Sequence, residues 1–194
     1  MRPLIGFESG ILISLSKQSV LVIGLGVCMT CGLLADDVVV SEQTFSCILD
    51  WPKIRNTHVN NADPEKLKEA MRIFRDSVPN TEYPVGTILQ LIPSEAMVKH
   101  AHGTFPKTNG LEFFSLEVSA AGTKISDRGD NVVNHSQGVT CLSCHEPAAQ
   151  YDFVCEKGHG CAPIPLDDKQ MPRTIRVIPA FAEMQAADSR CLKK

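Results

Sequence analysis

The sequence lacks an excess of charge of one sign, and it also lacks internal repeats and low-complexity segments. Its 19 basic and 22 acidic residues give a formal net charge of −3, and the basic side chains are scattered along the chain. We therefore see no footprint for nucleic acid and expect no nucleic-acid partner. Charged residues make up 21% of the chain and apolar residues 43%, which argues against wholesale disorder. At 194 residues, the chain is expected to form one domain, with or without an N-terminal extension.

A hydrophobic run of full membrane-spanning length is also missing. Residues 20–35 read VLVIGLGVCMTCGLLA, which is shorter than the ~18–20 apolar residues that a spanning helix needs. The run follows Arg2 and Lys17, ends at the small Ala35 and precedes two aspartates, an order typical of a secretory signal. We expect residues 1–35 to be a signal peptide that directs export to the periplasm, and residues 36–194 to form the domain. An uncleaved membrane anchor is the alternative, and membrane contact is expected only through this segment.

The clearest helix is expected within residues 60–80, NNADPEKLKEAMRIFRDSVPN. Asp63 can cap its N-terminus, Pro64 suits the first helical position and Glu65 favours the positive end of the helix dipole. Pro79 should end it. One apolar face is formed by Leu67, Ala70, Met71, Phe74 and Val78.

After this helix the apolar pattern changes to a period of two. Residues 86–92 (GTILQLI) and 111–118 (LEFFSLEV) predict strands, and the AGTKI segment predicts a turn followed by another short strand. Residues 96–98 are ambiguous but can form a strand, and Pro179 can open a last helix in residues 178–189. In the second strand, Phe114, Leu116 and Val118 should share one face. The predicted fold class is α+β, an antiparallel β-sheet with a few packed helices and a C-terminal c-type haem motif.

The haem prediction comes from the pattern Cys-x-x-Cys-His at Cys141, Cys144 and His145. Covalent attachment of haem needs two thiols that reach the two vinyl groups and a histidine that follows directly to bind the iron. Zinc is one alternative, because Cys155 and Cys161 with His159 between them make an imperfect second half-site. A redox dithiol is the other, although no βαβ pattern precedes Cys141. We expect one covalent haem c, with His145 as the proximal iron ligand.

Eight cysteines are present, and two of them, Cys28 and Cys31, lie inside the apolar run. Neither follows a residue typical of a lipid-modified cysteine. Outside the haem motif, the exported domain has four candidate disulfide cysteines: Cys47, Cys155, Cys161 and Cys191. They allow three pairings in an oxidising compartment. Pairing Cys155 with Cys161 is locally easy, and pairing Cys47 with Cys191 would join the two ends of the domain.

Three blocks of the chain resemble the cytochrome P-460 family. They are residues 83–90 (YPVGTILQ), 97–109 (MVKHAHGTFPKTN) and 141–154 (CLSCHEPAAQYDFV), and together the resemblance covers about residues 81–154. The family comprises exported mono-haem c-type proteins built on an antiparallel sheet, and its relatives include the β-sheet kind of cytochrome c prime. The resemblance implies either oxidation of hydroxylamine or binding of nitric oxide at an open haem iron.

One residue of the family pattern is missing. The hydroxylamine-oxidising members carry a lysine that is covalently linked to the haem edge, and it is expected on the strand after the GT pair. Here that strand reads Ile88, Leu89, Gln90 and Leu91. Lys99 and Lys53 are available but do not match that position. The enzyme class therefore stays open, with a haem oxidoreductase as one option.

The sixth iron ligand decides the role of such a protein, because a second protein ligand favours electron transfer and an open face favours small ligands. The candidate distal ligands are Met171, Met184 and His159. If the distal face is open, Phe113 or Phe114 is the candidate wall that excludes water.

Three functional hypotheses follow. The first is an exported carrier of single electrons with a redox partner protein, and the second is a haem enzyme or sensor that acts on nitric oxide or hydroxylamine. The third is a structural subunit anchored in the membrane by its N-terminal segment.

Overall fold

A single antiparallel sheet organises the part of the chain that the computed structural model describes, residues 37–134, 138–162 and 177–193. Six strands pair in sequence order, each with the next: β1 (Lys53–Ile54), β2 (Thr57–Asn60), β3 (Ile88–Ile92), β4 (Glu95–Lys99), β5 (Leu111–Ser119) and β6 (Gly122–Gly129). Residues 96–98, ambiguous in the sequence, lie inside β4. A second, two-stranded sheet pairs β7 (Val133–Asn134) with β8 (Val139–Thr140). The predicted α+β class with an antiparallel sheet is confirmed.

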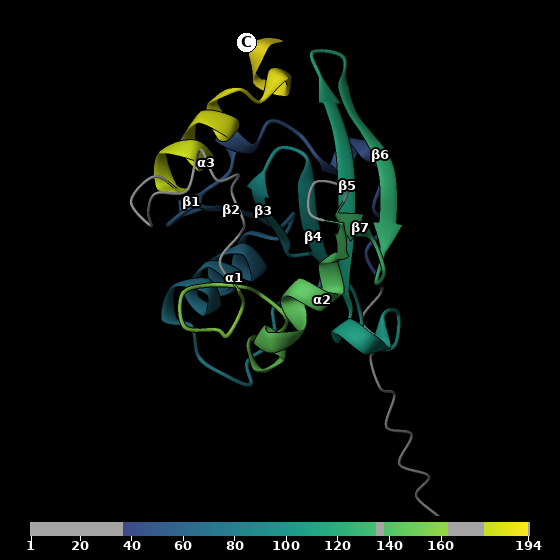
Figure 1. Ribbon diagram of the computed structural model, residues 1–194, viewed down its shortest axis with the longest axis vertical. Helices are drawn as coiled ribbons and strands as arrows, with labels where there is room; N and C mark the ends of the chain where they lie inside the picture. Colours follow the sequence, from purple (N-terminus) through teal and green to yellow (C-terminus); the bar gives the residue numbers. More distant parts are fainter. Residues whose placement is uncertain (1–36, 135–137, 163–176, 194) are drawn as a thin grey trace, which may run out of the picture. The chain divides into compact units, whose positions relative to one another are not determined.

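Three α-helices and several short 3₁₀ helices surround the described part of the sheet (Figure 1). They are α1 (Pro64–Asp76), α2 (Cys141–His145), α3 (Val177–Ala186), η1 (Glu42–Thr44), η2 (Ile48–Asp50), η3 (Pro106–Thr108), η4 (Glu146–Tyr151) and η5 (Ser189–Lys193). Among these described helices, none is long and apolar enough to cross a membrane. The predicted signal segment and Met171 lie outside the described residues.

The cap predicted for α1 is present. The Asp63 carboxylate accepts hydrogen bonds from the backbone N–H groups of Glu65 (2.9 Å) and Lys66 (3.4 Å). The helix ends slightly earlier than predicted, because Ser77 takes the left-handed conformation with φ 51° before Pro79 is reached.

The two faces of the sheet carry different cores. On one side, which we call the motif face, Met97 of β4 and Phe113 of β5 are register partners, and the apolar side chains continue into α1 and α2. On the opposite face, Phe114 and Leu116 pack with the N-terminal segment, and Val118 lies against them, as the period of two predicted. Residues of the opposite-face core are Val40, Phe45, Ile48, Trp51, Ile88, Ala96, Val98, Phe114 and Leu116.

The C-terminal segment is fastened to the opposite-face side of the fold. Helix α3 packs against η2 and β3, and the Gln185 amide donates to the carbonyl groups of Asn56 and Leu91, both at 2.6 Å. The buried Asp188 carboxylate pairs with Arg190 (2.8 Å) and accepts from the Ile48 N–H group.

Candidate functional site

The Cys-x-x-Cys-His motif forms the short helix α2, which lies in front of β4 and β5 in Figure 1. Thr140 caps it by accepting a hydrogen bond from the Ser143 N–H group, and the N–H group of Cys141 donates to the Val132 carbonyl (2.8 Å). Residues three apart share one side of a helix, so Cys141 and Cys144 face the same direction. Both cysteines are free thiols.

His145, the last residue of α2, has a fixed ring orientation. Its Nδ1 atom lies 2.7 Å from the carbonyl oxygen of Phe153. Because a carbonyl can only accept, Nδ1 carries the proton and Nε2 keeps its lone pair. Within the described residues, Nε2 has no hydrogen-bond partner. A histidine that binds a metal through one nitrogen commonly donates its other N–H to a backbone carbonyl in this way.

The turn after α2 brings the Phe153 carbonyl back to the histidine. Helix η4 ends at Tyr151, and both Asp152 (φ 53°) and Phe153 (φ 60°) take the left-handed conformation. This reversal is closed by a hydrogen bond from the Phe153 N–H group to the Ala148 carbonyl (3.0 Å). Burial lowers the pKa of His145, which keeps its imidazole neutral at pH 7.

An apolar cluster lies beneath the motif on the motif face. Its buried members are Leu111, Phe113 and Val132, and its half-buried neighbours are Met97, Cys141, Leu142 and Phe153. The rings of Phe113 and His145 have centroids 5.0 Å apart. Phe114, the other candidate wall, points to the opposite face, where it packs on Phe45 and beneath the Arg128 guanidinium. Of the two phenylalanines, only Phe113 lies beside the motif.

A zinc site is not supported by the arrangement of possible ligands. In the part of the chain that is described, the one group of three or more metal-ligating side chains is Cys47, Asp188 and Cys191. Its two cysteines are joined in a disulfide, so their sulfurs are not available as thiolates. The Cys155–Cys161 bond likewise removes the second half-site that the sequence suggested around His159.

A reactive dithiol is also disfavoured. Burial, the Glu95 carboxylate and the Cys144 thiol raise the pKa of Cys141 to about 11. Catalytic dithiols instead have a thiol with a depressed pKa, because the thiolate is the nucleophile.

The four cysteines outside the motif that lie within the described residues form two disulfides, Cys47–Cys191 and Cys155–Cys161. This is one of the three pairings that the sequence left open. The first joins the N-terminal part of the domain to η5, and the second closes a short loop beside α2, where the Cys155 sulfur lies 3.6 Å from the Cys144 carbonyl.

His159, a candidate distal ligand, is buried against η4. Its ring stacks on Tyr151 with centroids 3.7 Å apart, and its Nδ1 lies 2.6 Å from the Val154 carbonyl. His145 and His159 therefore bond to the carbonyls of consecutive residues. The Nε2 atom of His159 has no hydrogen-bond partner among the described residues, so its protonation pattern is the same as that of His145, and the stacking on Tyr151 holds the ring against η4.

The methionines divide between the two sides of the fold. Met184 is half-buried on α3, which packs against η2 and β3 rather than against the motif. Met97, which was not among the candidate ligands, lies in the cluster with Phe113 and Cys141. Only the strand register brings it there, so no sequence signal could have selected it.

The two lysines weighed for a haem cross-link both have other partners. Lys99 is almost fully buried and its Nζ lies 2.7 Å from the Asp152 carboxylate. The Nζ of Lys53 lies 2.6 Å from the Gln185 side-chain oxygen.

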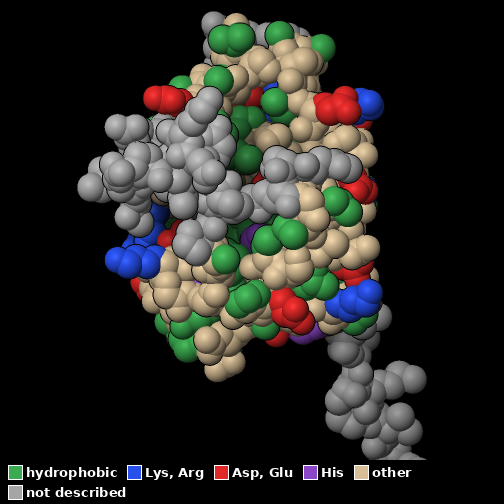
Figure 2. Space-filling view, viewed as in Figure 1, with side chains coloured by type: hydrophobic (Ala, Val, Ile, Leu, Met, Phe, Trp, Pro, Cys, Tyr) green, Lys and Arg blue, Asp and Glu red, His purple; other side chains and the backbone are tan. Residues whose placement is uncertain are grey.

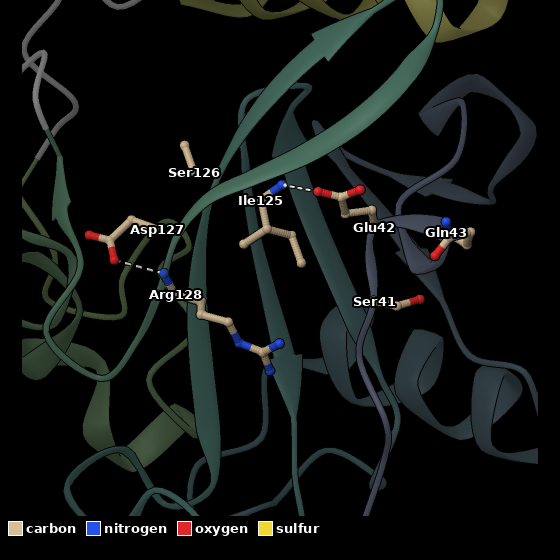
Figure 3. Close-up of a pocket in the computed structure, with 7 residues that line it drawn as sticks. All are labelled: Ser41, Glu42, Gln43, Ile125, Ser126, Asp127 and Arg128. Atoms are coloured by element: carbon tan, nitrogen blue, oxygen red, sulfur yellow. Dashed lines mark hydrogen bonds between the residues drawn. The ribbon is translucent and has the colours of Figure 1, made fainter.

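An open pocket of about 610 Å³ lies between η1 and β6 (Figure 3). It is lined by Ser41, Glu42, Gln43, Ile125, Ser126, Asp127 and Arg128. The Arg128 guanidinium is already paired with Glu112, at 2.7 and 2.8 Å, and the Ile125 N–H group donates to Glu42. On the face drawn in Figure 2, acidic and basic side chains of the described residues are dispersed.

The chain matches no protein-family model, no curated protein and no solved structure.

Proposed function

We propose that this chain is an exported c-type haem protein that holds one covalent haem through Cys141 and Cys144, with His145 as the proximal iron ligand. The observation that carries the proposal is the hydrogen bond between Nδ1 of His145 and the Phe153 carbonyl, at 2.7 Å. It leaves Nε2 of a neutral imidazole as the atom available to a metal. The resemblance to the cytochrome P-460 family supports the same assignment.

The cysteine chemistry supports it independently. Cys141 and Cys144 stay free thiols on one side of a helix, while the four other cysteines of the domain pair with one another. In an oxidising compartment, thiols pair unless something else claims them. Covalent attachment to haem is a reaction that would use both the Cys141 and the Cys144 thiol.

The chain's own residues would shape the surroundings of the group. Leu111, Phe113 and Val132 would supply an apolar floor that excludes water, and the Phe153 carbonyl would orient the His145 ring. A bound haem supplies an iron that can exchange one electron and bind a small ligand.

Small-ligand redox chemistry at an open iron is the leading role, with nitric oxide or hydroxylamine as the ligand. Two of the candidate protein ligands favour it, because the His159 ring is stacked on Tyr151 and Met184 lies on α3, which packs against η2 and β3. One-electron transfer to a partner protein is the second role. It is favoured by the position of Met97, a thioether in the cluster around the motif.

The proposal is tested by expressing the full chain for periplasmic export and recording visible spectra, oxidised and reduced. We expect a haem that stays attached when the protein is denatured. The matched control uses the two cysteine pairs of the C-terminal half: Cys141→Ala/Cys144→Ala should abolish attachment, and Cys155→Ala/Cys161→Ala should retain it. Equal haem content in both double variants would contradict the assignment.

The same spectra separate the two roles. Broad high-spin bands that shift on adding nitric oxide support the open iron, whereas sharp low-spin bands support an electron carrier with a protein ligand. In the second case, Met97→Leu should convert the low-spin bands to high-spin ones.

A further inference from the structure

A buried ion pair holds Asp152, the residue before Phe153. Nζ of Lys99 on β4 is 2.7 Å from Oδ1 of Asp152, and the side chains are 3% and 0% exposed. The side-chain amide of Asn109 also donates to Oδ1 (2.8 Å), and the backbone N–H group of Tyr83 donates to Oδ2 (2.9 Å). Both carboxylate oxygens are therefore satisfied, which a buried charge requires if it is to be tolerated.

The ion pair is connected to His145 through the backbone of Phe153 and one hydrogen bond. Asp152 immediately precedes Phe153, whose carbonyl accepts the Nδ1–H of His145. Both residues take the left-handed conformation, which costs free energy for residues other than glycine and persists only where the surroundings enforce it. The Asp152 carboxylate is the side chain that can enforce it.

The far side of this turn is fixed as well. Val154 is 2% exposed and packs in the core formed by α1, β2 and β3. The Phe153 carbonyl thus lies between Asp152, which is held by polar contacts to β4 and to the loop residues Tyr83 and Asn109, and Val154, which is held by apolar packing. With both neighbours held, the Phe153 carbonyl can keep a fixed position, as the hydrogen-bond partner of a metal-binding histidine must.

We propose that Asp152, held by Lys99, is a positioning residue that fixes the tautomer and ring orientation of His145 through the Phe153 carbonyl. This rests on the proposed function for its consequence at the iron, but the effect on the imidazole belongs to the chain itself. Neutralising the pair should free the turn, weaken the Nδ1–H bond and allow the Nε2–H tautomer.

The test compares two buried ion pairs of nearly equal burial. The target is Lys99→Met/Asp152→Asn, in which neither partner is left as a lone buried charge. The control is Arg190→Met/Asp188→Asn, because that pair has 3% and 0% exposed side chains and belongs to the C-terminal segment.

The first readout does not need haem. The background is the full chain with Cys141→Ala/Cys144→Ala. The target pair and the control pair are each changed separately in this background. Nitrogen-15 NMR then reports which imidazole nitrogen of His145 is protonated. We expect a single Nδ1–H pattern in the background chain and in the control, and loss of that single pattern in the target. An unchanged pattern in a folded target, or the same loss in the control, would overturn the proposal.

The second readout uses the haem-loaded chain with its cysteines intact. The target should shift the midpoint potential and the oxidised spectrum, since the hydrogen bond to a ligating histidine tunes its basicity. The control should leave both unchanged. If no haem is attached at all, the proposed function fails, and the NMR comparison still decides the role of Asp152.

Discussion

At the scale of single residues, Phe113 and Phe114 show how strand geometry separates the candidate site from the opposite-face core. Successive side chains of a strand point to opposite faces. Phe113 therefore lies beside His145, and Phe114 lies in the opposite-face core. The sequence predicts that the two face opposite ways and places Phe114 with Leu116. It does not say which face meets α2, because that depends on how residues 141–154 cross the sheet.

These neighbours give a matched pair of variants. Phe113 and Phe114 are 2% and 1% exposed, so Phe113→Leu and Phe114→Leu should each lower the free energy of unfolding by roughly 1–2 kcal/mol. Only Phe113→Leu should also change the visible spectrum of the haem-loaded protein. Urea unfolding and absorption spectra measure the two effects, and a spectral change confined to Phe114→Leu would contradict the site.

At the scale of elements, the parts with strong local signals were predictable. Local sequence patterns determine the Asp63 cap, the amphipathic face of α1 and the alternating strand β5. The short strands β1 and β2 and the left-handed turn at Asp152 and Phe153 were not predicted. Their conformations are imposed by pairing with β3 and by the contact with Lys99, which residues nearby in sequence do not encode.

The two disulfides should differ in their effect on stability. Cys47 and Cys191 are 144 residues apart, and Cys155 and Cys161 are 6 apart. In the chain-entropy description, the longer loop should contribute about 5 kcal/mol and the shorter about 2 kcal/mol. Cys47→Ala/Cys191→Ala should therefore lower the urea midpoint more than Cys155→Ala/Cys161→Ala. Equal midpoints for the two double variants would show that the C-terminal segment is not held by this bond.

At the scale of the whole molecule, buried carboxylates make stability depend on pH. Burial alone would raise the pKa of Glu112, but hydrogen bonds from His100 and Arg128 lower it below its ordinary value of 4.5. Burial raises the pKa of Glu95 despite a hydrogen bond from Asn134. A lowered folded-state pKa means stability that is present above 4.5 and lost as pH falls through the lowered value. A raised one means the reverse, a gain as pH falls through the raised value.

Two variants should separate these opposing contributions. Glu112→Gln should flatten the loss of stability below about pH 4.5, because the unfolded state no longer has a carboxylate here that binds a proton before the folded state does. Glu95→Gln should make the decline in the free energy of unfolding begin at higher pH. It removes the stability that protonation of Glu95 adds as pH falls. Urea unfolding at a series of pH values from about 3 to 7 measures both, and identical pH profiles for the two variants would contradict these assignments.

Of the candidate site, only the three motif residues could be predicted from the sequence. Cys141, Cys144 and His145 lie within five consecutive residues, so their spacing in the sequence is enough to select them. Phe113 and Met97 reach the motif from β5 and β4, Lys99 on β4 reaches Asp152, and only the sheet register places them there. These side chains decide the orientation of His145 and the polarity of its surroundings.

The central claim is that Cys141 and Cys144 carry a covalent haem. The most direct measurement is the intact mass of the exported, purified and denatured chain. We expect the mass of the processed polypeptide plus one haem, and loss of that added mass in Cys141→Ala/Cys144→Ala. A wild-type mass with no addition, obtained in cells that attach haem to other exported proteins, would contradict it.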